Sequence, residues 1–337
     1  MAGYLVRRLL LLIPMTLGIT LITFLIVRMA GAGGDEQGDP TQGGRSTERG
    51  GSPRENMMAE EFGAIDSSLA SQYLHWLGHA ARGDFGESLN DGLPVAAKIA
   101  RALPITLVFN LLAVIVIYLL AVPAGVYAAM HPGKRFDTFS SLLLYILFSM
   151  PSFWVAILLI RYVGSTVSGL GWLPYNSVYP DGWRNMTTLQ FFWYALPYMV
   201  LPLVSMSYNG MAGLSRYARV GMIEVVRMDY IRTARAKGLS EAAVMIRHAF
   251  PNSVIPLVTL LGDLLPGMIG GSVIIEAIFS IPGMGKLGYD AVVQKDYTVL
   301  MAVTTLSAIL TMLGILLSDL LYAAVDPRIG FDAEGTR

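Results

Sequence analysis

The sequence predicts an all-α integral membrane protein with six transmembrane helices. Of its 337 residues, 54% are hydrophobic and only 14% are charged, and the mean hydropathy is +0.55. Soluble globular domains carry about 25% charged residues, so this chain is too apolar and too weakly charged to be one. It also contains six apolar stretches close to or above the roughly 20 residues that a helix needs to cross the hydrocarbon layer.

The six predicted spans follow one another along the chain and are separated by charged residues. They cover residues 9–27, 102–130, 138–160, 185–215, 249–275 and 297–318. Strands of a membrane barrel would instead alternate over about ten residues, so we expect helices. The first span also has features of a signal peptide, with Ala30-Gly31-Ala32 in the place of a cleavage site. Its length and the position of Arg28 favour a retained membrane helix.

Basic residues predict which ends of the spans face the cytoplasm. Basic pairs occupy positions 7–8 and 134–135, and seven further basic residues lie within 216–248. Six alternating spans would place these three regions on one side. The opposite side includes residues 31–91, where eleven acidic residues outnumber four basic ones. We therefore expect both termini and the loop at 216–250 to be cytoplasmic.

The sequence suggests three parts. These are a cytoplasmic N-terminus with the first span (1–30), an external loop (31–101) and a five-helix core that contains the cytoplasmic loop (102–337). Within the external loop, residues 31–54 hold eight glycines among polar residues, a composition that cannot bury a core. After it, apolar residues at helical spacing predict a helix over 57–81.

Charge and residue usage exclude several other classes of protein. Lys plus Arg and Asp plus Glu both number 24, so no basic excess is available to neutralise phosphates, and we expect no nucleic-acid partner. The chain has no cysteine and only four histidines. That usage excludes disulfides, thiol nucleophiles and thiolate metal sites and offers no convincing metal cluster. The lipid bilayer is the one partner that composition itself predicts.

The loop at 216–250 is the most informative segment outside the predicted spans. We expect a helix over 222–237, ended by Gly238 in the left-handed conformation that glycine adopts readily. Ser240 would then cap a second helix, with Glu241 favourably placed at its positive end. Two short basic helices could contact lipid head groups, but such contact requires no glycine corner. Docking to a cytoplasmic protein is the sharper hypothesis.

The run YIRTARAKG, from Tyr230 to Gly238, resembles the cytoplasmic signature of permease subunits in ATP-binding-cassette (ABC) importers. It is most similar to the version in the first of the two permeases of dipeptide and oligopeptide systems. Of the importers' general signature, only Ala234, Gly238 and Pro251 match. Other strings along nearly the whole chain resemble the same branch: YLVRRLLLLIPMTLG, RGDFGES, LPITL, MPSFW, PGMG and DPRI. The Gly-rich stretch at 33–56 does not fit that pattern.

The resemblance implies a type I ABC importer permease fold in the bacterial inner membrane and a defined set of partners. These are a second homologous permease, two ABC ATPase subunits, an external solute-binding protein and a peptide substrate. ATP and Mg²⁺ would be used by the ATPase, because this chain lacks a phosphate-binding Gly-x-x-x-x-Gly-Lys-[Ser/Thr] motif. We expect the chain itself to be no enzyme and to bind no cofactor or metal. The residues implied in coupling to the ATPase are Tyr230, Arg232, Ala234, Arg235, Lys237 and Gly238.

Two acidic residues are candidates for the translocation path or its gate. Asp263 is the one charge in the middle of a predicted span; it could line an aqueous path or bond a neighbouring helix. Glu276 lies near the external end of the fifth span, where it could belong to an outer gate.

Three alternatives to a peptide importer stay open on the sequence. The same machine could carry nickel chelates, glutathione or oligosaccharides. An ion-coupled secondary transporter would show inverted repeats and paired charges near the midplane, and the sequence has neither. A membrane-embedded enzyme would need a converging catalytic constellation, which the spans lack.

Overall fold

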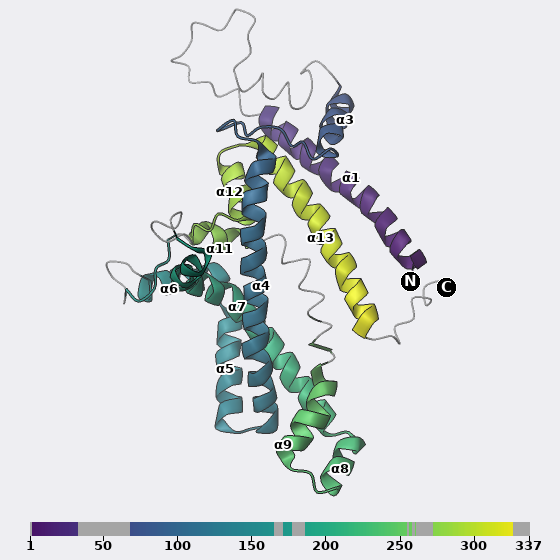
Figure 1. Ribbon diagram of the computed structural model, residues 1–337, viewed down its shortest axis with the longest axis vertical. Helices are drawn as coiled ribbons and strands as arrows, with labels where there is room; N and C mark the ends of the chain where they lie inside the picture. The colour runs from purple at the N-terminus through teal and green to yellow at the C-terminus, as the bar shows by residue number, and fades with distance from the viewer. Residues whose placement is uncertain are drawn as a thin grey trace, which may run out of the picture. The chain divides into compact units, whose positions relative to one another are not determined.

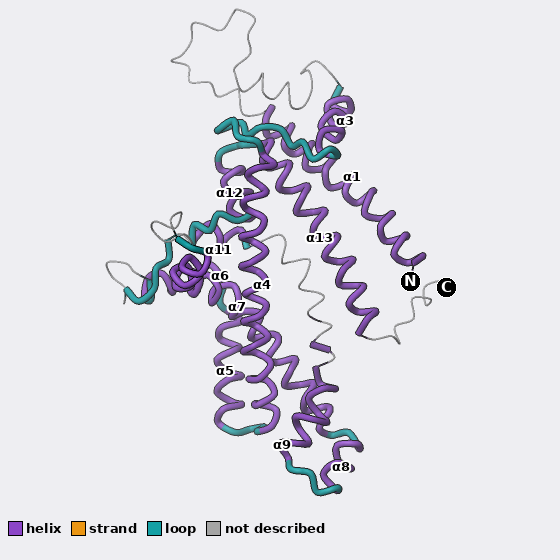
Figure 2. The backbone as a smooth tube through the Cα atoms, viewed as in Figure 1, coloured by secondary structure: helices purple, strands orange, loops and turns teal. Residues whose placement is uncertain are grey.

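The computed structural model describes residues 2–32, 68–164, 171–176, 186–254, 256–257, 260 and 272–325. Within these ranges every regular element is a helix, and Figure 2 shows no strand among them. In chain order (Figure 1) they are α1 (Ala2–Ala32), α3 (Leu69–Ala80), α4 (Val95–Met130), α5 (Arg135–Ser149), α6 (Ser152–Tyr162), α7 (Thr188–Val226), α8 (Asp229–Ala236), α9 (Glu241–Ala243), η4 (Val244–Ala249), α11 (Val273–Ile278), α12 (Met284–Val293) and α13 (Tyr297–Val325). The all-α prediction is confirmed for this part of the chain.

The chain divides into two compact units. Unit 1 comprises Met1–Ile105 and Pro282–Leu313, and unit 2 comprises Thr106–Ile281 and Gly314–Arg337. Helices α4 and α13 each contribute residues to both units. The candidate sites described below each lie within one unit.

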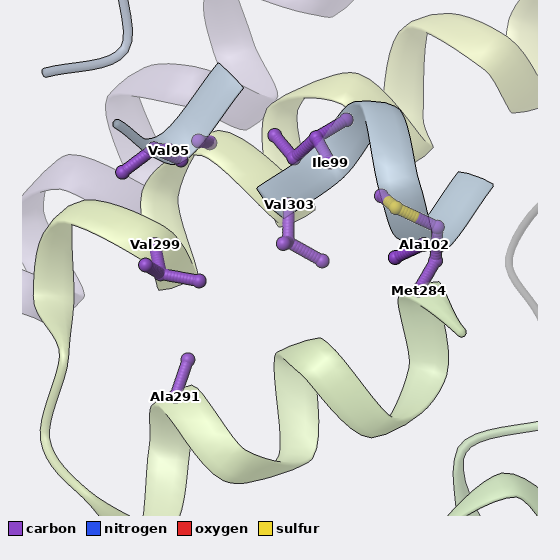
Figure 3. Packing of buried hydrophobic residues seen from close by; sticks show 8 residues of the cluster. Val95, Ile99, Ala102, Met284, Ala291, Val299 and Val303 are labelled. Atoms are coloured by element: carbon purple, nitrogen blue, oxygen red, sulfur yellow. The ribbon is translucent and has the colours of Figure 1, made fainter. Parts of the chain in front are cut away.

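In unit 1, the start of α4 packs with α12 and α13. Val95, Met284 and Val299 belong to one buried apolar cluster of these three helices (Figure 3). A second cluster joins Trp76 of α3 to Phe24 of α1 and to the start of α13. Helix α3 corresponds to the helix predicted after the Gly-rich stretch, and the first part of that prediction lies outside the described residues.

Three described helices are long and apolar enough to cross a membrane. They are Leu10–Met29 within α1, Val95–Met130, which is all of α4, and Tyr297–Leu320 within α13. These helices coincide with the first, second and sixth predicted spans.

The third predicted span, 138–160, is not one continuous helix. It is divided between α5 and α6, which are bent by 104° at the break. Pro151 has no N–H to donate, and its ring disfavours the helical conformation at the residue before it. Met150 is accordingly extended, with φ −90° and ψ 131°. The prediction of a single helix was wrong here, although α5 and α6 together are apolar enough for one broken span.

Helix α7 covers the fourth predicted span and extends beyond it. Its start is fixed by a capping box, in which Gln190 N donates to Thr187 Oγ1 (3.4 Å) and Thr187 N donates to Gln190 Oε1 (3.0 Å). Such reciprocal bonds satisfy amide groups that the first helical turn leaves without partners. Most of the fifth predicted span, including Asp263, lies outside the described residues.

Candidate functional site

The loop at 216–250 begins inside α7 and turns sharply after it. The sequence predicted one helix over 222–237, which is wrong: α7 ends at Val226, Met228 is extended with ψ 151°, and α8 begins at Asp229. The break brings Met222 and Ile231 into one buried cluster. In an unbroken helix these two residues would lie roughly 13.5 Å apart along the axis. Burying them together therefore requires the turn.

Helix α8 packs its apolar residues into unit 2. Ile231 and Ala234 are buried in a cluster with Val244 and Ala249 of the following helical segment and with Ala129 near the end of α4. Ala234, implied in coupling by the sequence, thus lies in a close-packed interior. A larger side chain at this position would force α8 outward, because such interiors do not accept added volume without strain.

The remaining surface of α8 is exposed and mostly basic; its one acidic residue, Asp229, accepts a hydrogen bond from Arg232 Nη1 (3.5 Å). Arg232, Arg235 and Lys237 are exposed, and Tyr230 is 44% exposed. Asn252 Nδ2 donates a hydrogen bond to the Tyr230 hydroxyl oxygen (3.0 Å), which fixes the direction of that ring. Five of the six residues that the sequence implies in coupling, Gly238 included, are therefore accessible around one helical corner.

Gly238 forms the corner as predicted. Its φ is +79°, in the left-handed region that a residue with a side chain enters only at a cost, and its N–H donates to the carbonyl of Arg235 (2.9 Å). Ser240 caps the next helical turn, with Ala243 N donating to Ser240 Oγ (3.4 Å). The predictions for the corner and for the cap are both confirmed.

An ion pair closes the corner. Arg235 donates to Glu241 through Nη2–Oε1 (2.6 Å) and Nε–Oε2 (3.1 Å). The hydrogen bond from Arg235 lowers the pKa of Glu241, and the same bond raises the pKa of Arg235. Both side chains are more than one third exposed, so the pair orients the corner more than it stabilises the fold.

A partly buried ion pair at the base of the loop was not predicted from the sequence. Asp137, in the first turn of α5, is 4% exposed. Its carboxylate accepts hydrogen bonds from Arg219 Nε (2.6 Å) and Nη2 (2.8 Å) and from Gly133 N (2.9 Å). The guanidinium of Arg219 is the main cause that lowers the pKa of Asp137. The two partners are 82 positions apart, so no local pattern could have revealed the pair.

Glu276, the candidate gate residue, is buried in the first turn of α11 and is only 1% exposed. Its Oε1 accepts a hydrogen bond from Thr106 Oγ1 (3.0 Å). Thr106 belongs to the LPITL string, so a segment that resembles the family meets the candidate gate residue at this carboxylate. Asp263, the other candidate, lies outside the described residues.

In unit 1, Asp296 holds the segment that follows α3 onto the start of α13. Its carboxylate is buried and accepts hydrogen bonds from Ser88 Oγ (2.5 Å), Leu89 N (3.3 Å) and Val299 N (3.3 Å). The RGDFGES string thus meets the residue that precedes Tyr297. Among the described residues, no group of three or more His, Cys, Asp or Glu is placed to hold a metal ion.

The structure thus combines apolar helices with an exposed helical corner, the arrangement implied by the resemblance to permease subunits of ABC importers. Residues 121–331 match the family described as "Binding-protein-dependent transport system inner membrane component". The chain belongs to this family, which confirms the resemblance found in the sequence and makes it a membrane permease component of such a system.

Curated relatives match this chain over nearly its whole length. The oligopeptide transport system permease protein AppB of Bacillus subtilis is 38% identical, over 98% of this chain and 100% of its own. The di/tripeptide transport system permease protein DppB of Pseudomonas aeruginosa is 34% identical, over 98% and 99%. The dipeptide transport system permease protein DppB of Escherichia coli K12 is 35% identical, again over 98% and 99%.

Proposed function

We propose that this chain is one of two permeases that together form the membrane path of an ATP-driven importer of di- and oligopeptides. The observation that carries the proposal is the exposed basic corner of α8 and Gly238, joined to the long helix α7 by a single turn. The peptide cargo is supported by the names of relatives that align over 98% of the chain. An external solute-binding protein would deliver the peptide, and two separate ATPase subunits would use ATP and Mg²⁺.

The proposed topology has six spans with both termini in the cytoplasm. It is supported by three described helices of sufficient length and by a fourth, broken pair, α5 and α6. The basic residues before the first span and in the two predicted cytoplasmic loops favour this orientation. The bend at Pro151 changes the shape expected for the third span, not the number of spans.

Docking of the ATPase would use the outer surface of the corner. Tyr230 and Lys237 would offer an aromatic ring and a cationic group to a partner surface that bears carboxylates. Arg232 and Arg235 could add their charges by exchanging Asp229 and Glu241 for carboxylates of the partner. Ala234 would act from the inside, by allowing α8 to lie close to its own unit. A push on α8 would then reach α7 as a rigid-body displacement.

The path itself would involve Asp263 and Glu276. We propose that the Glu276–Thr106 hydrogen bond holds a closed arrangement at the external end and breaks when the path opens outward. A buried carboxylate is costly unless it is hydrogen-bonded, so its partner must change when the surrounding helices move.

The corner can be tested with two substitutions at Gly238. An added Cβ meets no atom within 4 Å, so any cost comes from the backbone conformation alone. Gly238→Asn should keep ATPase co-purification and uptake of a radiolabelled tripeptide near wild-type values, because Asn tolerates left-handed φ. Gly238→Val should lose both while the permease still inserts in the membrane. Wild-type uptake by the Val variant would refute the docking role of the corner.

The cargo requires its own measurement. Cells that lack this gene should lose uptake of the tripeptide and regain it with the wild-type gene. If uptake does not depend on the gene while the ATPase still co-purifies, the alternative cargoes (nickel chelates, glutathione or oligosaccharides) become the next to assay.

A further inference from the structure

Helix α7 is hydrogen-bonded at two separate points to α5 and to the bend between α5 and α6, which we call the α5–α6 pair. At the first point, Asp137 of α5 binds Arg219 of α7 through the two short hydrogen bonds described above. At the second, the Tyr208 hydroxyl of α7 donates to the carbonyl of Met150 (2.6 Å), at the bend between α5 and α6. We call these contacts, formed by Asp137, Arg219, Tyr208 and the Met150 carbonyl, the α5–α7 clamp.

Both points of the clamp hold groups that have few other ways to be satisfied. Asp137 and Tyr208 are nearly fully buried. Met150 stands at a helix end, where carbonyl groups lose their intrahelical donors, and Pro151 beside it has no N–H. A buried donor or acceptor that loses its partner pays its desolvation cost, so the clamp favours one fixed arrangement of α5 on α7.

Helix α4 also packs closely on α7. A Cβ added at Gly210 of α7 would lie 2.6 Å from Ile117 Cδ1, and one added at Gly125 of α4 would lie 2.8 Å from Ala218 Cβ. Contacts this close lock two helices together, as small residues commonly do in membrane proteins. Within unit 2, α4, α5 and α7 are therefore built to move as one body.

We propose that Asp137, Arg219 and Tyr208 are positioning residues that make the α5–α6 pair follow the coupling loop at 216–250. The inference rests on the proposed function, in which the ATPase moves the loop at 216–250. That loop is continuous with α7, whereas along the chain the α5–α6 pair reaches α7 only through the connection that follows α6. Helices α5 and α6 also pack along α7, but packed helices can still slide past one another by small amounts. The clamp opposes such sliding, so α5 and α6 keep one position on α7 when α7 moves.

The decisive test is a distance measurement that does not depend on the cargo. The chain has no cysteine, so Leu142→Cys on α5 and Tyr217→Cys on α7, both exposed, can carry spin labels in the full complex, with its partner subunits freed of cysteine. Double electron–electron resonance is then recorded without nucleotide and with ATP and vanadate. We expect one narrow distance, unchanged between the two states.

The same labelled pair with Asp137→Asn should show a broadened distance that differs between the two states. In the labelled protein that keeps Asp137, a difference of more than about 2 Å between the distances in the two nucleotide states would overturn the proposal. Helices at interfaces move by about this much. If Leu142→Cys fails to fold, Phe139→Cys on the same helix, also exposed, replaces it.

A second measurement separates positioning from simple stability. In proteoliposomes, Asp137→Asn should lower the peptide imported per ATP hydrolysed by about 2- to 30-fold, the range that mutations along coupling networks produce, while the ATPase co-purifies normally. The pair Asp137→Asn with Arg219→Gln should recover part of the ratio, because no unpaired guanidinium is left. Asp290→Asn, in an i,i+4 pair of α12, is the matched control and should change nothing. A wild-type ratio of peptide imported to ATP hydrolysed in Asp137→Asn would refute the clamp. If the wild-type complex imports no peptide, the proposed cargo is refuted, and the spin-label distances still test the clamp.

Discussion

Gly125 is the position where the smallest substitution should have the clearest effect on unit 2. The first atom of a side chain at this position would strike the backbone carbonyl of Ser215 and lie 3.1 Å from the backbone nitrogen of Arg219. Both are rigid atoms of α7, so no side-chain rotation can make room. Gly125→Ala must therefore move α4 away from α7.

The expected size follows from two opposing terms. Overpacking a close contact costs about 1–3 kcal/mol, and replacing a helical glycine by alanine returns about 0.5–1 kcal/mol of helix propensity. The net loss of stability is therefore about 0–2.5 kcal/mol. Any shift at Arg219 also strains its ion pair with Asp137, which moves the result toward the upper end.

The matched control is Gly213→Ala, because a Cβ at Gly213 of α7 meets no atom within 4 Å. This variant gains the propensity term without the clash and should be slightly more heat-stable than wild type. The assay is the thermal midpoint of the purified protein in detergent, followed by fluorescence-detected size exclusion. We expect the midpoint of Gly125→Ala below wild type and that of Gly213→Ala at or above it. Equal midpoints for the two variants would show that the α4–α7 contact is not as close as described.

Three further predictions address other contacts. Arg219 holds the pKa of Asp137 below its ordinary value, so the stabilisation is present above the unfolded pKa of about 4 and is lost as the pH falls through the lower folded pKa. Between about pH 6 and pH 3, the thermal midpoint of Asp137→Asn should therefore drop less than that of the wild type. An equal drop in both proteins would contradict this. Asp296→Asn should weaken the attachment of the segment after α3 by roughly 1 kcal/mol and speed tryptic cleavage at Arg82 about fivefold; an unchanged rate in limited proteolysis would count against it. Ala234→Leu should lower the yield of folded protein through an overpacking cost of about 1–3 kcal/mol, and normal yield on size exclusion would mean that α8 is not held as closely as its burial indicates.

The parts of the fold set by local chemistry could be predicted from the sequence. Three membrane helices followed from runs of apolar residues, and the left-handed corner followed from Gly238 after a basic helix. The bend at Met150 was also available, because Pro151 is visible in the sequence and its effect on the preceding residue is general. A charge-free stretch of membrane-spanning length predicts one helix, and length and charge alone do not reveal such a bend.

The contacts that organise the candidate site could not be predicted in the same way. Asp137 and Arg219 are 82 positions apart, and Ser88 and Asp296 are 208 apart. Each of these residues, taken alone, is an ordinary polar residue; Arg219 lies within α7, and Ser88 lies in the segment between α3 and α4. Only the packing of the helices decides that they meet, and a single sequence carries no signal of such pairing.

The coupling loop combines a stiff base with an adaptable surface, and this combination suits a part that transmits movement. At the base, Ala129, Ala234 and Ala249 are buried together, and such small side chains have almost no rotamers through which a displacement could be absorbed. At the surface, Arg232 and Lys237 are long and exposed and can follow a partner while keeping their charges engaged. A movement applied at the surface is therefore passed to α7 with little loss, and the α5–α7 clamp determines whether α5 and α6 move with it.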